Sequence, residues 1–469
     1  MSLARRDAPR LDAAQRERGI QRTECGIEFA EARGRSLRLG RLRVQTIAAS
    51  EPDRSARHGS AREVLGAFLR LGCLSFGGPV AHLGYFHAEF VERRRWCDEE
   101  TFGEIVALAQ ALPGPASSQV GFVLGLLRAG GAGAAAAWLG FTMPSALLML
   151  AFAFGHRLLS GRLGAGAVHG LQLVAVAVVA QAIVSMRRTL APDWARMALA
   201  VAAGLVVFFN LGALLAIAMG AVVGLALPRG RQPTSANRGQ IWGTSAANEK
   251  QMWGSVGFVP SVVAAVMFVL LLFGLPVAAL LAAHYREEHF LLWQGLAVAN
   301  AFFRTGALVF GGGHVVLPLL ERAVVQPGWV DPSTFLAGYG AAQAIPGPLF
   351  TFSAFLGAVV RPAVAPVLIS AVALVTIFLP GLLLIVVVLP HWSRLRERPR
   401  IQAALRGVNA SVVGVLAAAF VHPVWTSAVH SLRDVAIALA AFVLLVRWRI
   451  APWVVVAAVA GVSILTALV

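Results

Sequence analysis

Two short motifs that interrupt helices, each present twice, are the features of this sequence best suited to binding an ion. The motifs are Phe76-Gly77-Gly78-Pro79 with its repeat Phe310-Gly311-Gly312-Gly313, and Pro113-Gly114-Pro115 with its repeat Pro346-Gly347-Pro348. Proline removes a backbone N–H and clashes with the preceding turn, whereas glycine lets the backbone bend and exposes its amides. The helix that follows such a break presents N–H groups with partial positive charge, which suits an anion.

Polar side chains stand at fixed distances before these motifs. Arg70 and Arg304 lie six residues before the Phe-Gly-Gly motifs, and Gln110 and Gln343 lie three residues before the Pro-Gly-Pro motifs. Arginine is always protonated and forms bidentate hydrogen bonds to oxyanions, and within a membrane span it is functional by default. Either arginine could instead extend its charged end to the membrane surface. The glutamine amides could bind substrate oxygens or bridge helices.

Glu104 and His314 are the candidates for carrying a coupled proton. A carboxylate at membrane depth is a functional candidate, and histidine titrates in the physiological range. Glu89, Glu321 and His82 also lie near the motifs. The sequence contains none of the HExxH, GxSxG or GxxxxGK[ST] signatures, and its three cysteines form no CxxC pair. We therefore expect no enzyme activity, no metal site and no cofactor.

The composition indicates that helices in a lipid bilayer position these residues. The chain has 469 residues, of which 58% are hydrophobic and 13% charged, and its mean hydropathy is +0.72. Soluble proteins carry about 25% charged residues. Many apolar runs are long enough to cross roughly 30 Å of hydrocarbon. The sequence thus predicts an all-α polytopic membrane protein of about 12–13 membrane segments with broken or re-entrant helices.

The order and spacing of the motifs indicate a duplicated chain. Each motif of the first copy recurs 233 or 234 residues later, in the same order. The predicted organisation is a disordered basic tail over 1–62, a first repeat over 63–227, a polar linker over 228–255, a bridging transmembrane helix over 256–284, and a second repeat over 290–469. Asp98 and Asp331 precede matching segments and are predicted to cap helices.

The two repeats are expected to have opposite orientations in the membrane. Six spans followed by one bridging span turn the second copy upside down, and most arginines then fall in loops on one side, as the positive-inside rule requires. This distribution explains the net charge of +17 without a nucleic-acid partner. Arg93-Arg94-Arg95 is an exception, unless the segment that begins the first repeat is a re-entrant hairpin. That alternative would change the number of spans.

Paired broken helices in two inverted repeats are the best sequence indicator of a transport site. Irregular backbone at membrane depth is tolerated only where it is buried in protein or lines a wet cavity, and repeat symmetry would bring the breaks together at one central site. In the alternative interpretation, glycine and proline only kink or pack the membrane helices. The sequence does not decide whether the protein forms a homodimer.

The motifs together resemble those of the chromate ion transporter family. The resemblance covers about residues 63–469 and includes FLRLGCLSFGGPVAHLGYF and AQALPGP, AFFRTGALVFGGGHVVLPLLE and AQAIPGP, and the later GVNASVVG at 407–414. It implies a long-chain, two-domain member in the bacterial inner membrane that exports chromate, drawing on the proton gradient, and so confers resistance. The second repeat departs from the pattern at Gly313, where the first has Pro79, so the halves are expected to contribute unequally.

Three functions remain open at this stage. The first is a secondary transporter for chromate or another tetrahedral oxyanion such as sulfate, because these near-isosteric dianions are poorly discriminated by hydrogen bonds alone. The second is a passive anion channel on the same scaffold. The third is an intramembrane enzyme acting on lipid-linked substrates, which would need acids, histidines or a nucleophile clustered at depth. The sequence shows no such cluster.

Overall fold

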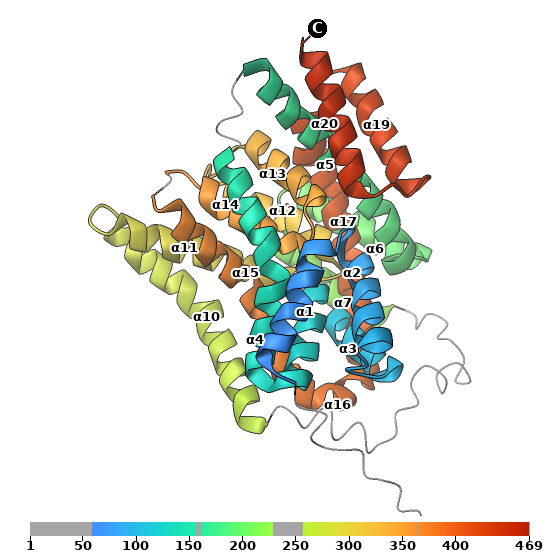
Figure 1. Cartoon of the computed structure of the whole chain (residues 1–469), viewed down its shortest axis with the longest axis vertical. Helices are drawn as coiled ribbons and strands as arrows, with labels where there is room; N and C mark the ends of the chain where they lie inside the picture. Colours follow the sequence, from blue (N-terminus) through green and yellow to red (C-terminus); the bar gives the residue numbers. More distant parts are fainter. Residues whose placement is uncertain (1–58, 156–160, 228–256, 363, 469) are drawn as a thin grey trace, which may run out of the picture. The chain divides into compact units, whose positions relative to one another are not determined.

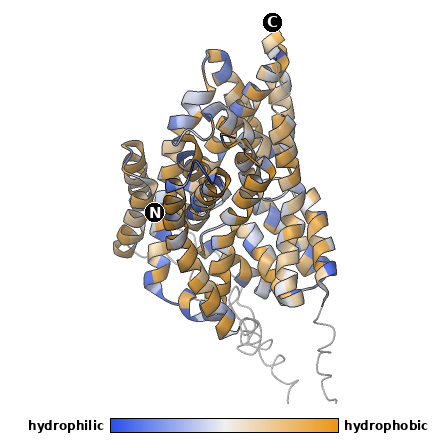
Figure 2. Cartoon of the chain, turned by 90° about the vertical axis from the view of Figure 1, so that its left-hand side faces the viewer, coloured by the Kyte–Doolittle hydropathy of each residue, from blue (hydrophilic) through white to orange (hydrophobic). Residues whose placement is uncertain are grey.

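The computed structural model describes residues 59–155, 161–227, 257–362 and 364–468, and these residues form helices and no strands (Figure 1). Five of these helices are long and apolar enough to cross a membrane, and four more are apolar but shorter. Hydrophobic residues cover most of the helical surface (Figure 2). The predicted all-α polytopic membrane fold is confirmed. Of the predicted parts, the linker 228–255 and nearly all of the tail 1–62 lie outside the described residues.

The helices of the first repeat are interrupted at both motifs. In chain order they are α1 (Ala61–Leu74), α2 (Gly78–Phe86), the π-helix η3 (His87–Arg93), α3 (Glu99–Ala111), α4 (Ala116–Gly155), α5 (Gly161–Leu190), α6 (Trp194–Phe208) and α7 (Ala213–Ala226). The Asp98 side chain caps α3, accepting from the Thr101 N–H at 2.8 Å, as predicted. α4 is kinked where Ala129 and Gly130 leave helical geometry.

The second repeat follows the same order after α10 (Phe258–His284). Its helices are α11 (Phe290–Leu308), η5 (Gly313–Val315), α12 (Val316–Leu320), η6 (Glu321–Val325), α13 (Pro332–Ala344), η7 (Leu349–Thr351), α14 (Phe352–Val359), α15 (Pro366–Val388), η8 (Leu389–His391), α16 (Trp392–Arg396), α17 (Pro399–Ala419), η9 (Phe420–Trp425), α18 (Thr426–Ala428), α19 (Leu432–Val446) and α20 (Pro452–Leu468). Asp331 precedes α13 without a side-chain capping bond and instead pairs with Arg361. Its predicted capping role is wrong.

The bridging helix α10 contacts few other side chains. It packs along α11 and α15 (Figure 1), and its buried residues are Ser261 and Ala264. The Ser261 hydroxyl donates to the Val387 carbonyl at 3.1 Å. Large apolar side chains such as Leu270 and Phe273 remain exposed. A helix that is apolar on all sides and buried on one narrow stripe is suited to facing lipid.

The two repeats exchange their last pairs of helices. The hairpin of α6 and α7 packs against α17 of the second repeat, and α19 and α20 pack against α5 of the first (Figure 1). Glycines permit these close approaches. A Cβ on Gly414 would lie within 2 Å of the Ala200 carbonyl oxygen, and one on Gly170 would lie 2.7 Å from Ala460 Cα. Close backbone contact at small residues is a common mode of helix association in membranes.

Candidate functional site

Each predicted break is a real interruption between two helices. α1 ends at Leu74 and α2 begins at Gly78, while α3 ends at Ala111 and α4 begins at Ala116. The second repeat is interrupted at the corresponding places. Glycines take positive φ at all four breaks, as shown by Gly77, Gly78, Gly114, Gly311, Gly312 and Gly347. Side-chain-bearing residues rarely adopt this conformation, so each break requires its glycine.

Two reciprocal backbone hydrogen bonds join the breaks of one repeat to those of the other. The Gly347 N–H donates to the Ser75 carbonyl at 2.9 Å, and the Gly114 N–H donates to the Val309 carbonyl at 2.8 Å. Ser75 and Val309 immediately precede the two Phe-Gly-Gly motifs. We call the Ser75–Gly347 contact the first junction and the Val309–Gly114 contact the second junction.

The two Phe-Gly-Gly motifs also approach each other. A Cβ on Gly313 would lie 3.5 Å from Pro79 Cγ and 3.7 Å from the Leu349 side chain, which follows the second Pro-Gly-Pro. With the two junctions, this contact brings all four breaks together. Because Gly313 lies against Pro79, the position where the repeats depart from each other is itself part of their contact.

The long helices α4 and α15 support the junctions from equivalent positions. A Cβ on Gly347 would lie 2.7 Å from Ser145 Oγ of α4, and one on Gly114 would lie 3.1 Å from Gly381 Cα of α15. Pro144 and Pro380, one residue earlier, lie inside their helices. The two supports are thus alike in sequence as well as in position.

Gln119 is a clamp at the second junction that the sequence did not single out. Its fully buried amide donates from Nε2 to the Pro113 carbonyl at 2.9 Å and to the Gly381 carbonyl at 3.1 Å. It thereby ties the first Pro-Gly-Pro motif to α15 of the other repeat. Its distance of four residues from Pro115 is the only sequence signal that could have indicated this role.

The first junction is surrounded by buried polar side chains. His82 Nδ1 lies 3.4 Å from Ser117 Oγ, and the His82 ring meets the Phe141 ring edge-on with centroids 5.2 Å apart. The Ser145 hydroxyl donates to the Thr142 carbonyl at 3.1 Å. Sequence reasoning named His82 only for its place near the glycines, because the short motif gives no sign of the long-range contact to Phe141.

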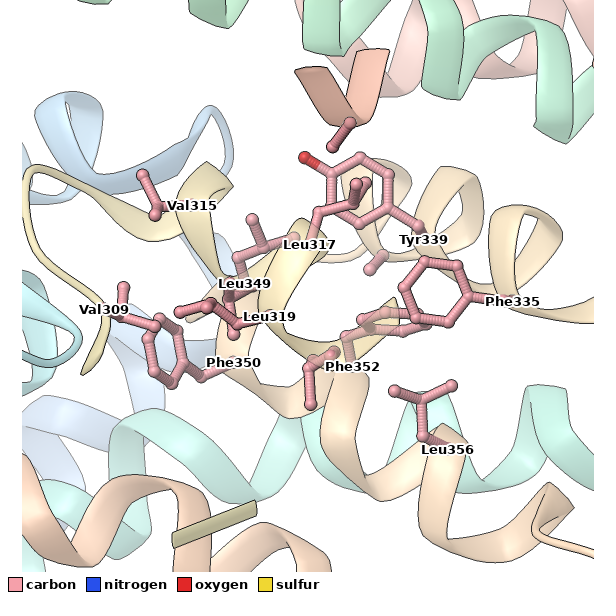
Figure 3. Packing of buried hydrophobic residues seen from close by; sticks show 14 of the residues in the cluster. Val309, Val315, Leu317, Leu319, Phe335, Tyr339, Leu349, Phe350, Phe352 and Leu356 are labelled. Carbon is pink, nitrogen blue, oxygen red and sulfur yellow. The ribbon is translucent and has the colours of Figure 1, made fainter. Parts of the chain in front are cut away.

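Beside the Gln119 amide, the second junction packs against large apolar side chains. Val309 and Phe350 belong to the large buried cluster that also holds Phe335 and Phe352 (Figure 3). The Phe350 and Phe378 rings have centroids 5.6 Å apart. The two junctions therefore offer different chemical surroundings around the same backbone arrangement.

The predicted polar residues flanking the motifs differ in their surroundings. Arg70 and Gln110 are exposed, whereas Gln343 is half-buried, and its Nε2 has no hydrogen-bond partner among the described residues. Arg304 lines an open recess of about 380 Å³ together with Arg322 of η6 and the start of α7. No contact described in the structure joins either arginine of the predicted site to the junctions.

The two proton-coupling candidates both have buried partners. Glu104 pairs with Arg396 and accepts from the Trp392 indole N–H at 3.1 Å, which ties α3 to α16. His314 Nδ1 lies 2.8 Å from Tyr339 Oη. Glu89, another acid considered from the sequence, pairs with Arg93 and Arg94. Among the described residues, no group of three His, Cys, Asp or Glu side chains could hold a metal ion.

A helical membrane fold with broken helices from two halves meeting at one place defines a multi-pass protein of the kind that moves ions or small solutes. The family profile described as "Chromate transporter" matches residues 62–225 and 296–464. Since these two regions cover more than half of the chain, the protein belongs to the chromate transporter family.

Named relatives agree with this assignment. The chain is 29% identical over 414 residues to a "Probable chromate transport protein" of Synechococcus elongatus, covering 86% of this chain and 95% of the relative. It is 27% identical over 360 residues to a "Chromate transport protein" of Pseudomonas aeruginosa, covering 76% and 79%. A protein of the same name from Cupriavidus metallidurans is 27% identical over 389 residues, covering 81% and 86%. These relatives are transport proteins, not enzymes. No solved structure matches the chain.

Proposed function

We propose that this protein transports chromate, or a near-isosteric tetrahedral oxyanion such as sulfate, across the bacterial inner membrane. Export from the cytoplasm, driven by the proton gradient, is the direction and energy source that the family resemblance suggests. The observation that carries the proposal is the pair of reciprocal hydrogen bonds from Gly114 to Val309 and from Gly347 to Ser75. They bring four helix breaks from two repeats to one place.

The proposed site consists of the four motifs and the polar residues that flank them. Broken helices with free backbone N–H groups favour an anion, and buried irregular backbone in a membrane protein is expected at a substrate path. The inverted orientation of the repeats would let either half open to its own side of the membrane while the site stays central. Arg304 and Arg322, which share the recess beside α7, would attract an anion toward it electrostatically.

The test is uptake into inside-out vesicles or proteoliposomes that contain the full chain. We expect chromate to accumulate against its gradient, and we expect a protonophore to abolish that accumulation. The degree to which sulfate, molybdate or phosphate inhibits chromate uptake gives the order of preference among these anions. Empty liposomes are the control, and the membrane-inserted Gly311→Leu variant is expected to be inactive.

A passive anion channel on the same scaffold is the second candidate. Its supporting observation is the open recess lined by two arginines, which would suit conduction as well as it suits binding. A channel would equilibrate chromate without accumulation and would be insensitive to the protonophore. That result would overturn the secondary-transport proposal and leave the oxyanion assignment in place.

A further inference from the structure

The two junctions have equivalent positions with opposite chemistry. We name the first set the polar half-site, which consists of Ser75, His82, Ser117, Thr142 and Ser145. The corresponding residues of the other repeat form the apolar half-site. Val309, Val316 and Phe350 are found by counting from the motifs, and Phe378 and Gly381 by aligning Pro380 of α15 with Pro144 of α4. Every residue of the polar half-site has a hydrogen-bonding side chain, and none of the apolar half-site does.

The residues of the polar half-site form one connected group around the first junction. Ser75 receives the Gly347 N–H, and Gly347 lies directly over Ser145 of α4. Ser145 bonds to the Thr142 carbonyl one turn earlier. Phe141 of that same turn contacts the His82 ring, and His82 in turn faces Ser117 at the start of α4. The group therefore draws on α1, α2 and α4 of the first repeat and on the second Pro-Gly-Pro.

Three polar atoms of this group are buried without a hydrogen-bond partner. They are Ser75 Oγ, His82 Nε2 and Thr142 Oγ1, on residues that are 0%, 1% and 0% exposed. If His82 Nδ1 accepts from the Ser117 hydroxyl, its Nε2 carries the proton and becomes a donor. Each such group left unpaired costs about 1–3 kcal/mol. Their residues belong to one contact group, and buried polar groups left unpaired call for a partner, which a bound hydrogen-bond acceptor would supply.

The apolar half-site offers no such donors. Val309, Val316 and Phe350 are 0%, 0% and 1% exposed, and the side chains pack into the continuous buried cluster (Figure 3). An anion placed there would lose its hydration without replacement, which is strongly unfavourable. The second junction is thus suited to holding helices together and unsuited to holding a charged substrate.

We infer that the polar half-site binds a single tetrahedral oxyanion, held by neutral donors from Ser75, His82 and Thr142, while the apolar half-site serves as a dry packing element. This inference rests on the proposed oxyanion transport and makes it specific. Hydroxyl and imidazole donors satisfy an acceptor-only dianion such as chromate or sulfate. The two repeats, although built on one pattern, would carry one substrate per chain and not two.

Equilibrium dialysis of the purified full-length protein against radiolabelled sulfate and against chromate tests the inference. We expect one bound anion per chain. His82→Val and Ser75→Ala, which replace donors by groups of the kind found in the other repeat, are expected to weaken binding at least about tenfold, because a tenfold change corresponds to about 1.4 kcal/mol. His82→Gln keeps a donor and should stay within about threefold of the parent.

Matched controls come from the apolar half-site. Val316→Ala and Val309→Ala remove apolar atoms at the equivalent positions and should leave affinity within about twofold, since no donor is lost. Thermal unfolding and size-exclusion profiles of each variant identify any that do not fold. Ser75→Ala, which removes one oxygen, remains informative even if His82→Val unfolds.

The possible outcomes distinguish failure of the half-site inference from failure of the proposed transport function. Two anions bound per chain, or unchanged affinity in both His82→Val and Ser75→Ala, would overturn the inference while the parent protein still transports. Equal losses in the polar and apolar variants would overturn it as well. A parent protein that binds and transports none of chromate, sulfate or molybdate would overturn the proposed function itself.

Discussion

At each junction a Pro-Gly-Pro amide of one repeat donates to the carbonyl that precedes the Phe-Gly-Gly motif of the other, at 2.9 Å and 2.8 Å. Around the first bond lie serines and a histidine, whereas valine, phenylalanine and the fully hydrogen-bonded Nε2 of Gln119 lie around the second. The same hydrogen bond between repeats forms in both halves, although the breaks are followed by α-helix in the first repeat and by 3-10 turns in the second. The side chains differ at every position compared. The backbone hydrogen bonds hold the helix breaks in place in both repeats. The side chains around each break can therefore differ without changing this contact.

The same contrast extends beyond the junctions. π-Helices begin at His87 and at Glu321, which are equivalent positions of the two repeats. Glu104, buried in its ion pair with Arg396, corresponds to Ala337 in α13, which is also buried. The recess of Arg304 depends on Arg322 and the start of α7. The chemical difference between the repeats therefore extends to several places outside the junctions.

The largest effects are expected from the junction glycines, and they should be equal in both repeats. Gly114→Leu and Gly347→Leu each force a side chain onto positive φ and into the facing helix, at a cost of at least about 1–3 kcal/mol for the backbone alone. We expect both to abolish chromate transport. Gly103→Ala, at an open position of α3, is the control. Transport retained in one variant alone would show that only one junction matters.

Glu104→Gln should destabilise the protein more than Ala337→Gly at the equivalent position of the other repeat, which costs about 1 kcal/mol in a helix. Glu104 is buried against Arg396, and removing one member of a buried ion pair costs about 3–5 kcal/mol. Thermal unfolding in detergent measures the loss, and Glu104→Gln with Arg396→Met should recover part of it. If instead the single variant is stable but its transport no longer depends on pH, Glu104 carries the proton and its role is not structural.

These two cases also show how far sequence reasoning reached. The helix breaks could be predicted from glycine and proline, because the backbone effects of these residues are local. The Asp98 cap could be predicted as well, because a capping aspartate acts on the residues that directly follow it. The partners of Glu104 and Asp331 did not follow. Arg396 lies 292 residues from Glu104, and nothing in the spacing indicates that α3 and α16 meet. The role of Glu104 as a proton carrier stays a prediction, and nothing in the sequence indicated the arginine beside it.

The exchange of terminal helices between repeats was likewise invisible in the sequence. Internal similarity identified two copies, but it cannot tell whether a copy packs against its own last helices or those of its neighbour. His82 was undervalued for a similar reason. Its importance depends on Phe141 and Ser117, which chain folding brings to it, and a lone histidine on an apolar segment has no distinguishing pattern.

Arg304→Ala should reduce transport more than Arg70→Ala. Arg304 shares its recess with Arg322, whereas Arg70 lies on an exposed face of α1. Loss of one of two cations facing an anion path is expected to lower the apparent affinity about tenfold, equivalent to about 1.4 kcal/mol. Concentration-dependent chromate flux measures this, with Arg304→Lys as the variant that keeps the charge. A larger loss in Arg70→Ala would contradict the role given to the recess of Arg304 and Arg322.

The smallest expected effect is on thermal stability and concerns the ion pair of His87 and Glu99. The second repeat has Glu321 at the position equivalent to His87 and therefore lacks this pair. The hydrogen bond that His87 donates to the Glu99 carboxylate raises the pKa of His87. Partial burial opposes this shift, and the charges of Glu99 and Glu92 add to it. A raised pKa stabilises the fold fully below the unfolded value of about 6.5 and loses this contribution as pH rises through the folded pKa.

The melting temperature of the parent should therefore exceed that of His87→Gln slightly in mildly acidic buffer and equal it in alkaline buffer. Transport activity should be the same in both proteins at every pH. If the substitution shifts the pH dependence of transport, a proton-linked step lies at the π-helix of the first repeat, outside both half-sites.

The crossed packing of α6 and α7 on α17, and of α19 and α20 on α5, has a consequence for biogenesis. When the first repeat has been synthesised, the face of α5 that packs against α19 and α20 is still uncovered, because those two helices come later in the chain. The hairpin of α6 and α7 likewise lacks α17 at that point. We therefore expect neither half to complete its packing before the other has been inserted, and a chain that stops before α19 to leave α5 uncovered.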